Sequence, residues 1–367
     1  DWYIVSTYDE IVALLHDPRI SSHSRPQSVG GQEGRVFIGL DPPDHDKLRR
    51  MAMATFGPPH QPGRVDGLRE HMTDMVDELI DAMRGKGRVD IVDDFAYPFP
   101  VSVICAVLGV PREDEPQFHG WSQRIIALAD LDPSMTAEAR AARQADIDQA
   151  RLEMGLYFYE LAEKRKAAPG DDILSRLATA HGPDGQMDPV ELVSTAILLL
   201  IAGHETTVNL TTNGMLMLLR HPDLLERVRN ERELVVGLVE ELLRFEPPIQ
   251  ALPNRIAAED VTIAGTTIPK GAHITLLLAA GSRDPKRFPD PERFDPDRAD
   301  NQHLGFGSGI HYCFGAPMAR LEVQIALSAL VRRLVNPRLV EDPPPYRHNT
   351  TLRGPRHLLV DIDGIVD

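Results

Sequence analysis

The sequence predicts a mainly α-helical protein with a minor β part. Apolar residues recur at three- and four-residue spacing in several long stretches, and this is the period of a helix with a buried face. Short alternating stretches predict a few local strands, and the 30 prolines collect between the helical stretches, where they end regular structure. The chain has no repeat, low-complexity tract or Gly/Ser linker. We therefore predict one continuous domain over residues 1–367.

The predicted elements follow one another along the chain. Helices are predicted for Val65–Met83, Asp146–Lys166, Pro189–Leu219, Pro222–Phe245 and Pro317–Val335. A hairpin is expected around Gly265, where apolar residues alternate on both sides, and a further strand begins at His273. Prolines crowd residues 283–297 and each removes a backbone donor, so this stretch predicts a long ordered loop.

The composition is that of an acidic globular protein. The 39 Lys and Arg against 55 Asp and Glu give a formal charge of −16, and an acidic surface repels nucleic acid. The longest apolar run, residues 196–202, is shorter than the about twenty residues that span a bilayer. Cys105 and Cys313 lie in different surroundings, which favours a reducing compartment without a disulfide. We expect a cytoplasmic protein without membrane contact, and the start at Asp1 suggests that an N-terminal segment is missing.

One glycine-rich segment carries the strongest functional signal. Residues 306–322 place Cys313 just before a predicted helix, where the helix dipole and nearby backbone N–H groups favour the thiolate. Gly307, Gly309 and Gly315 lack the Cβ atoms that would keep a large flat ligand at a distance. The simpler interpretation of a lone cysteine is a buried core residue, and this context argues against it.

Other sites built on cysteine, glycine or histidine motifs lack their residues here. A dinucleotide fingerprint would need glycine at position 312, which is Tyr312. No Cys-x-x-Cys pair is available for zinc, for disulfide exchange or for covalent haem attachment. A zinc helix would need a second histidine four residues after His204, and that residue is Val208.

The pattern Phe-Gly-x-Gly-x-His-x-Cys-x-Gly at residues 306–315 resembles the haem-binding signature of the cytochrome P-450 family. The resemblance implies the cytochrome P-450 fold of the soluble bacterial type. In it, haem b (iron protoporphyrin IX) is buried between the long I-type helix and the L-type helix after the cysteine loop. Cys313 would be the axial thiolate on the haem iron, an anionic ligand that favours O–O cleavage. His311 would contact a haem propionate, and Phe306, Gly307 and Gly315 would line the haem.

A second motif of the family is a cluster of charged residues. Glu241-Leu-Leu-Arg244 resembles its Glu-x-x-Arg, and the i, i+3 spacing puts the carboxylate and the guanidinium on one helix face. Arg293, in Pro-Glu-Arg-Phe, resembles the third member of the family's Glu-Arg-Arg cluster. Outside this context, such a pair would be interpreted as an exposed surface pair. The resemblance implies a structural role for the trio.

The long helix carries a third motif. Its Ala-Gly-His-Glu-Thr at residues 202–206 resembles the family's Ala-Gly-x-Glu/Asp-Thr, and a carboxylate in this apolar stretch would be costly to bury without a partner. The resemblance implies that Ala202 leaves room over the haem and that Glu205 and Thr206 deliver protons to bound dioxygen. Alone, a helix threonine would be expected to bond back to its own turn.

Cationic side chains are expected to neutralise the two haem propionates, because buried carboxylates need partners. His45 and Arg49 lie at i, i+4 on one helix face, and both can donate to an anion. The resemblance assigns propionate contacts to these two residues, to Arg255 and to His311. Each of them alone would be interpreted as an exposed surface residue.

The implied activity is that of a haem-thiolate monooxygenase, which inserts one oxygen atom of O2 into a C–H bond or an alkene. The substrate would be a hydrophobic small molecule of the steroid, terpenoid, macrolide or fatty acid class. Family position assigns the substrate contacts to small or aliphatic residues and one threonine: Leu198, Ile201, Ala202, Ala251, Leu252 and Thr351.

Electrons must come from a partner, because the chain lacks a flavin or dinucleotide fingerprint and has too few cysteines for an iron–sulfur cluster. We expect a ferredoxin with an NAD(P)H-dependent ferredoxin reductase, docking on the cysteine side where Lys47, Arg50 and Arg320 offer local positive charge. Two alternatives stay open. The first is a peroxide-driven haem-thiolate peroxygenase, a class that commonly replaces the acid–alcohol pair, which is intact here as Glu205 and Thr206. The second is a non-catalytic haem-thiolate ligand-binding protein, which would need no proton relay.

Overall fold

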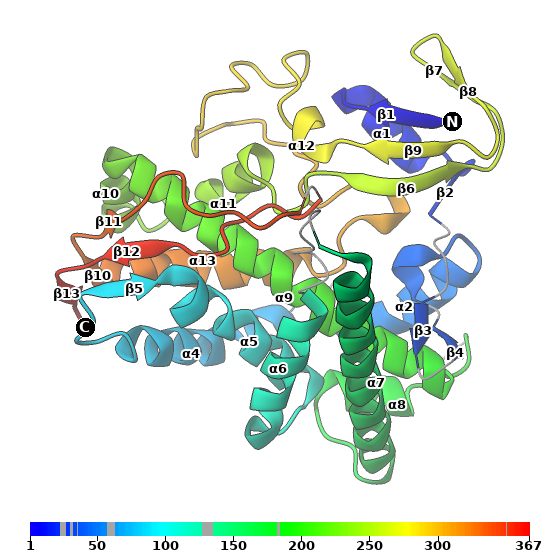
Figure 1. The fold of residues 1–367 in the computed structure, drawn as a ribbon, viewed down its shortest axis with the longest axis horizontal. Coiled ribbons are helices and arrows are strands. Elements are labelled where there is room, and N and C mark those ends of the chain that lie inside the picture. Colours follow the sequence, from blue (N-terminus) through cyan, green and yellow to red (C-terminus); the bar gives the residue numbers. More distant parts are fainter. Residues whose placement is uncertain are drawn as a thin grey trace. The chain divides into compact units, whose positions relative to one another are not determined.

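The structure is a computed structural model and is mostly helical with small sheets, as predicted (Figure 1). It describes residues 1–22, 27–29, 32–34, 36–56, 63–126, 135–181, 184–349 and 351–367. The chain divides into two compact units: unit 1 comprises Asp1–Ser21, Leu68–Pro100 and Thr206–Asp367, and unit 2 comprises Ser22–Gly67 and Val101–Glu205. The single domain over residues 1–367 stays a prediction.

The larger helical elements of unit 1 are four helices and the second half of a fifth. They are α4 (Arg69–Asp81), α10 (Pro222–Asn230), α11 (Leu234–Phe245) and α13 (Ala316–Arg333), with the end of α9 (Pro189–Arg220). The single helix predicted for Pro222–Phe245 is wrong, since the segment forms two helices, α10 and α11. They are separate because the polar residues 230–233 interrupt the apolar spacing. A Cβ at Gly214 of α9 would lie 2.8 Å from Leu327 Cδ1 of α13, so this glycine lets the two helices approach closely.

A four-stranded sheet completes the core of unit 1. Its order is β1 (Trp2–Val5), β9 (His273–Leu276), β6 (Leu252–Ala257) and β2 (Ile20–Ser21), with β1 parallel to β9 and the other pairs antiparallel. Helices α1 (Tyr8–His16) and α12 (Leu278–Gly281) supply buried residues to the same apolar cluster. The predicted hairpin is confirmed as β7 (Val261–Ile263) and β8 (Thr266–Ile268). Ala264 and Gly265 form its turn, both with positive φ.

The remaining elements of unit 1 are short. A three-stranded sheet orders β11 (Arg338–Leu339), β12 (Leu359–Asp361) and β5 (Arg88–Asp90), and β10 (Leu334–Val335) pairs with β13 (Gly364–Ile365). The π-helical turn η2 (Ile91–Ala96) and the 3₁₀ turn η4 (Gly309–His311) also belong here. The predicted proline-rich loop is confirmed, since residues 282–308, all of which the structure describes, contain no helix or strand.

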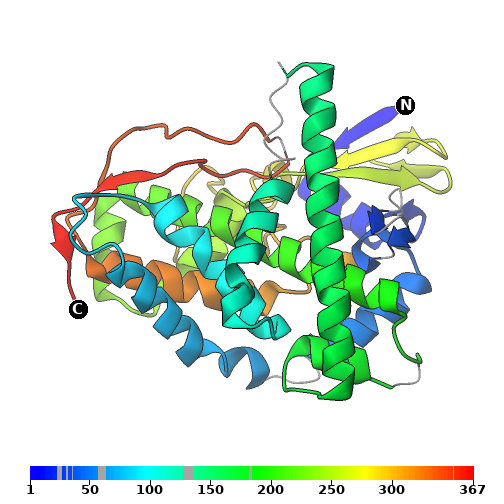
Figure 2. The same ribbon diagram turned by 60° about the horizontal axis from the view of Figure 1, so that its bottom comes forward.

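Unit 2 is built around α7 (Ala137–Ala167), the long upright helix of Figure 2. This helix begins earlier than predicted, because Thr136 caps it at a stretch whose side chains are almost all exposed and show no apolar period. The ring of Phe118 in α6 (Glu115–Ile126) packs against the ring of Tyr157 in α7, with centroids 5.0 Å apart. The other elements are β3 (Gln27–Val29), β4 (Gln32–Gly34), η1 (Phe37–Gly39), α2 (Asp44–Phe56), α3 (Gly63–Asp66), α5 (Pro98–Leu108), η3 (Arg112–Asp114), α6 (Glu115–Ile126), α8 (Ile173–Thr179) and the start of α9.

Two helical segments of the described chain are long and apolar enough to cross a membrane by length and composition alone. They are Ile91–Leu108 and Pro189–Arg220. Burial inside the structure reaches 72% and 61% of their apolar windows, which is typical of the core helices of a globular protein. The apolar part of α9 is therefore longer than the uninterrupted apolar run at residues 196–202.

Candidate functional site

The cysteine loop (residues 306–315) is closed by its own backbone. The N–H of Cys313 donates to the carbonyl of Phe306 at 2.9 Å, and the N–H of Tyr312 donates to the carbonyl of Gly309 at 3.0 Å. Gly315 is the N-cap residue of α13, so the half-buried thiol of Cys313 stands just ahead of the helix N-terminus. A thiolate at this position is favoured by the helix dipole.

The glycines of the cysteine loop have two different roles. A Cβ at Gly307 or Gly315 would meet no atom within 4 Å, so both border open space. A Cβ at Gly309 would lie 2.3 Å from the carbonyl oxygen of Leu15, and the φ of Gly309 is +70°. The expectation that all three glycines make room for a flat ligand is therefore wrong for Gly309, which lets the loop pack on α1. A half-buried sulfur beside open space fits a large flat group such as a haem.

The charged cluster behind the loop has a different third member from the one predicted. Glu241 and Arg244 are fully buried and pair at 2.7 Å, in agreement with the i, i+3 prediction. Arg298 is the second arginine on Glu241, with its Nε 3.3 Å from Oε2. The Arg293 side chain is 69% exposed and lies 3.5 Å from Asp295, whereas the backbone carbonyl of Arg293 accepts a hydrogen bond from Arg244. The assignment of Arg293 was thus wrong.

This cluster fastens the proline-rich loop to α11. Glu241 also accepts a hydrogen bond from the backbone N–H of Asp295 at 2.8 Å, and Arg244 donates to the carbonyls of Ser282 and Pro291. Every one of these partners belongs to the irregular segment before the cysteine loop. Such a network holds a loop that has no regular backbone hydrogen bonds of its own. This agrees with a structural role for Glu241 and Arg244.

The predicted residues of α9 share one helix stripe. Leu198, Ile201 and Thr206 are half-buried and Ala202 is exposed, whereas most of the central residues around them are buried. Their positions follow the i, i+3, i+4, i+8 pattern of a single face. Glu205 lies beside this stripe and is buried. The middle of α9 therefore has a short face that is less buried than its surroundings. A ligand that binds against the helix needs such a face.

The predicted propionate contacts are divided between the units. In unit 2, His45 is buried with its Nδ1 2.8 Å from Asp46 Oδ1, and the Arg49 guanidinium lies over the ring of Phe37 at 5.9 Å. In unit 1, the half-buried Arg255 lies on β6, and the half-buried His311 ends η4. Their shared role toward one ligand stays a prediction.

Two predicted substrate segments lie side by side in unit 1. The backbone N–H of Gln250 donates to the carbonyl of Thr351 at 2.8 Å, and Ile249 bridges to Leu352. Ala251 is therefore close in space to Thr351, although about a hundred residues separate them in sequence. This juxtaposition agrees with their assignment to a common pocket.

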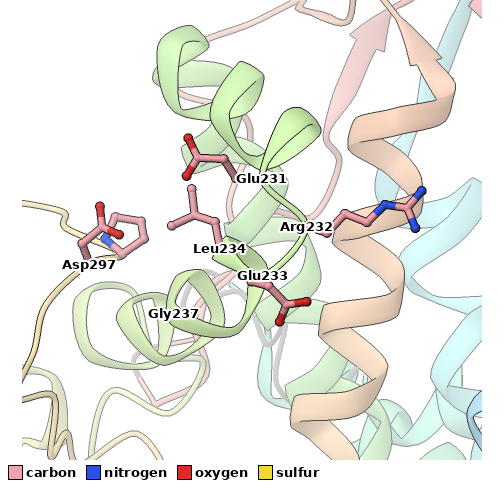
Figure 3. Close-up of a pocket in the computed structure, with 7 residues that line it drawn as sticks. Glu231, Arg232, Glu233, Leu234, Gly237 and Asp297 are labelled. Carbon is pink, nitrogen blue, oxygen red and sulfur yellow. The ribbon is translucent and has the colours of Figure 1, made fainter.

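A surface hollow of about 400 Å³ in unit 1 involves none of the predicted residues (Figure 3). Glu231 and Asp297 flank Leu234 there, while Arg232 points away from them. Arg227 donates to both carboxylates, at 3.2 Å and 3.1 Å. Glu231 and Asp297 are thus already paired, and the hollow marks the junction of α10 and α11.

The three cations predicted for partner docking are already ion-paired. Lys47 lies 3.9 Å from Glu191, Arg50 lies 2.8 Å from Asp184, and Arg320 lies 2.7 Å from Glu240. The expected local positive charge is therefore neutralised. The cysteine loop instead exposes Ile310 (48%) and Tyr312 (40%), which occupy variable positions of the motif and carried no sequence signal.

Comparison with known proteins identifies similarities over nearly the whole chain. The family model described as cytochrome P450 matches residues 2–360. Cytochrome P450 monooxygenase PikC of Streptomyces venezuelae is 39% identical over 90% of this chain and 77% of its own. The 6-deoxyerythronolide B hydroxylase of Saccharopolyspora erythraea is 37% identical over 99% of this chain and 91% of its own. The crystal structure of P450BioI with an acyl carrier protein ligated to hexadec-9Z-enoic acid superposes with a TM-score of 0.87. It is 35% identical and covers 98% of this chain and 92% of its own.

Proposed function

The chain belongs to the cytochrome P450 family of monooxygenases, and we propose that it inserts one oxygen atom of O2 into a C–H bond or an alkene of a hydrophobic small molecule. The observation that carries this proposal is the cysteine loop, in which the half-buried Cys313 stands at a helix N-terminus beside the open space at Gly307 and Gly315. When bound there, haem b supplies the activation of O2 with two electrons and two protons.

The side chains have separate tasks in this proposal. The thiolate of Cys313 would hold the haem through its iron, and His45, Arg49, Arg255 and His311 would donate to the propionates. On α9, the buried Glu205 holds a proton on its carboxyl away from bulk water, and the Thr206 hydroxyl passes it on. The remaining residues proposed to line the haem are Phe306, Gly307, Ala202 and Gly315.

The substrate class follows from the apolar character of the predicted pocket. Leu198, Ile201, Ala251 and Leu252 offer no charge and no hydrogen-bonding group, and Thr351 alone adds a hydroxyl. Such a lining suits a steroid, a terpenoid, a macrolide or a fatty acyl chain. One relative is named for 6-deoxyerythronolide B, and one similar structure holds a fatty acyl group on a carrier protein, which supports this range.

Electrons reach the enzyme from a ferredoxin and its NAD(P)H-dependent reductase in the cytoplasm. The exposed Ile310 and Tyr312 provide an apolar contact next to Cys313, since Arg320 is held by Glu240. Ile310→Glu should lower ferredoxin-dependent turnover about tenfold by repelling an acidic partner. Arg50→Glu, at a side chain already paired with Asp184, is the matched control and should change turnover little. Equal losses in both variants would contradict this contact.

The decisive experiment compares the wild type with Cys313→Ser after reduction with dithionite and exposure to carbon monoxide. A strongly red-shifted Soret band in the wild type, absent from the variant, is expected for a thiolate ligand. A band that is the same in both proteins would disprove thiolate ligation. Turnover with hydrogen peroxide alone would favour the peroxygenase, and ligand binding without any product would favour the non-catalytic alternative.

A further inference from the structure

A group of side chains in unit 1 packs directly behind the cysteine loop. Glu240 of α11 accepts two hydrogen bonds from Arg320 of α13, at 2.7 Å from Nε and 2.9 Å from Nη2. His303, in the segment that enters the loop, places its Nε2 3.2 Å from Glu240 Oε2. We name these three residues the Glu240 clamp. One carboxylate thereby joins α11, α13 and the entrance of the cysteine loop.

The hydrogen bonds of His303 define its role in the clamp. The backbone N–H of Gly305 donates to His303 Nδ1 at 3.1 Å, so Nδ1 acts as the acceptor. The proton is therefore assigned to Nε2, which donates to Glu240. The His303 side chain is only 4% exposed. Both ring nitrogens are thus satisfied within the protein, and the ring orientation is fixed.

The clamp reaches Cys313 through Phe306. The Arg320 guanidinium lies over the Phe306 ring, 4.6 Å from its centroid, and the His303 ring packs at 6.0 Å from the same ring. The carbonyl of Phe306 is the acceptor for the N–H of Cys313. A change in Glu240 would therefore move the residue that closes the loop around the cysteine.

The charges of Glu240 and Arg320 are stable over the ordinary pH range. Burial alone would raise the pKa of Glu240, but the hydrogen bonds from His303 and Arg320 outweigh it and lower the pKa to about 2. Burial disfavours the charge on Arg320, and its bonds to Glu240 outweigh this effect, so the pKa of Arg320 is raised. A two-point arginine–carboxylate pair of this kind is stronger and more directional than an exposed ion pair.

We propose that Glu240 is a positioning residue for the axial thiolate, acting through Arg320 and His303 on Phe306 and hence on the backbone bond that holds Cys313. This inference rests on the proposed haem-thiolate ligation. It assigns Arg320 an internal role and accounts for the paired state of this cation.

The test uses Glu240→Gln in the full-length protein as purified. The amide keeps the size of the carboxylate but removes its charge, and loss of charged hydrogen bonds should loosen the loop. We expect amide hydrogen exchange in residues 304–313 to become about tenfold faster. We also expect the red-shifted band of the reduced, carbon monoxide-bound protein to decay several times faster than in the wild type.

Asp77→Asn is the matched control, because Asp77 pairs with Arg333 at the opposite end of the same helix, at 2.8 Å. It also removes a carboxylate partner of an α13 arginine, but far along the helix from the loop. Exchange and band decay in Asp77→Asn should equal those of the wild type. If Glu240→Gln behaves like Asp77→Asn in both measurements, the positioning role is overturned.

Two further outcomes are distinguishable. If the wild type itself lacks the red-shifted band, the proposed thiolate ligation fails, and hydrogen exchange still decides whether Glu240 holds the Cys313 backbone. If Glu240→Gln does not fold, Arg320→Lys takes its place, since lysine keeps the charge but loses the planar fork and the stacking on Phe306. Arg320→Lys should show the same changes in smaller measure, and wild-type behaviour in Arg320→Lys would overturn the proposal.

Discussion

The cysteine loop and the middle of α9 hold their chemical groups in different ways. In the loop, the position of Cys313 depends on contacts with segments that are distant in sequence. The backbone at Gly309 packs against the carbonyl of Leu15, and the Arg320 guanidinium lies over the Phe306 ring. Along α9, Glu205 and Thr206 are placed by the backbone ladder of a continuous helix of 32 residues. A loop whose order comes from long-range contacts loses stability when one of them is removed. Substitutions on a regular helix can change the chemistry and leave the fold intact.

The largest effect should come from the segment that enters the loop. Arg298→Ala removes a mostly buried partner of Glu241 and should lower the free energy of unfolding by about 3–5 kcal/mol. Arg293→Ala, at an exposed side chain, should change it by less than about 0.5 kcal/mol. Urea unfolding of both variants measures the difference. A larger loss in Arg293→Ala would restore the original assignment of the third cluster member.

Within the cysteine loop, alanine substitutions at two glycines compare the destabilisation caused by close packing with that caused by backbone strain. Gly309→Ala places a methyl group 2.3 Å from the Leu15 oxygen and should destabilise the protein by about 2–4 kcal/mol. Gly307 has nearly the same φ, +69°, but a Cβ there would meet no protein atom within 4 Å, so without haem Gly307→Ala should cost only the strain of about 1 kcal/mol. Thermal unfolding of the two variants in their haem-free form provides the test. Equal losses would show that the packing of the loop on α1 contributes nothing.

On α9, the expected effect is on the reaction and not on the fold. Glu205→Gln should lower the rate of product formation about a hundredfold, because a proton donor in the transition state contributes that much or more. The amide has the same size as the carboxyl, so the melting temperature should shift little. Turnover and thermal unfolding of the same preparation test both parts. Unchanged turnover would remove Glu205 from the proton path, and a large loss of stability would contradict the contrast with the loop.

The sequence predicted the parts of the molecule that a local period controls. The long helices followed from apolar spacing, and the pairing of Glu241 with Arg244 followed from their separation by three residues. Arg298 was missed because its place on Glu241 depends on the course of an irregular loop, where no period applies. The contact of Gln250 with Thr351 was also beyond sequence pattern, since it joins two segments about a hundred residues apart.

The cysteine loop shows the same limit at smaller scale. Its motif identified Cys313, but the motif assigns one meaning to every glycine, and only the packing on Leu15 separates Gly309 from Gly307. The pairing of Arg320 with Glu240 likewise joins two helices that are distant in sequence. A positive residue near a functional loop was therefore interpreted as a docking group, although its charge is used inside the protein.

The smallest expected effect concerns α13, the regular helix that follows the loop. Burial of Glu322 raises the pKa of its carboxyl well above the usual value of 4.5, and its Oε2 has no hydrogen-bond partner within the described residues. The folded protein therefore holds a proton that the unfolded chain releases above about pH 4.5. The free energy of unfolding should fall as the pH rises from that value toward the raised pKa.

Glu322→Gln removes this titration and should stabilise the protein by about 1–2 kcal/mol near pH 7, because the amide needs no proton to stay neutral. The gain should shrink toward zero as the pH falls to about 4.5. Urea unfolding of both proteins across this range measures it, and Glu70→Gln, at an exposed side chain, is the control for the loss of one glutamate. A constant difference at every pH would mean that Glu322 does not titrate differently in the folded and unfolded states. In that case its substitution acts through packing alone, and the predicted pH dependence is wrong.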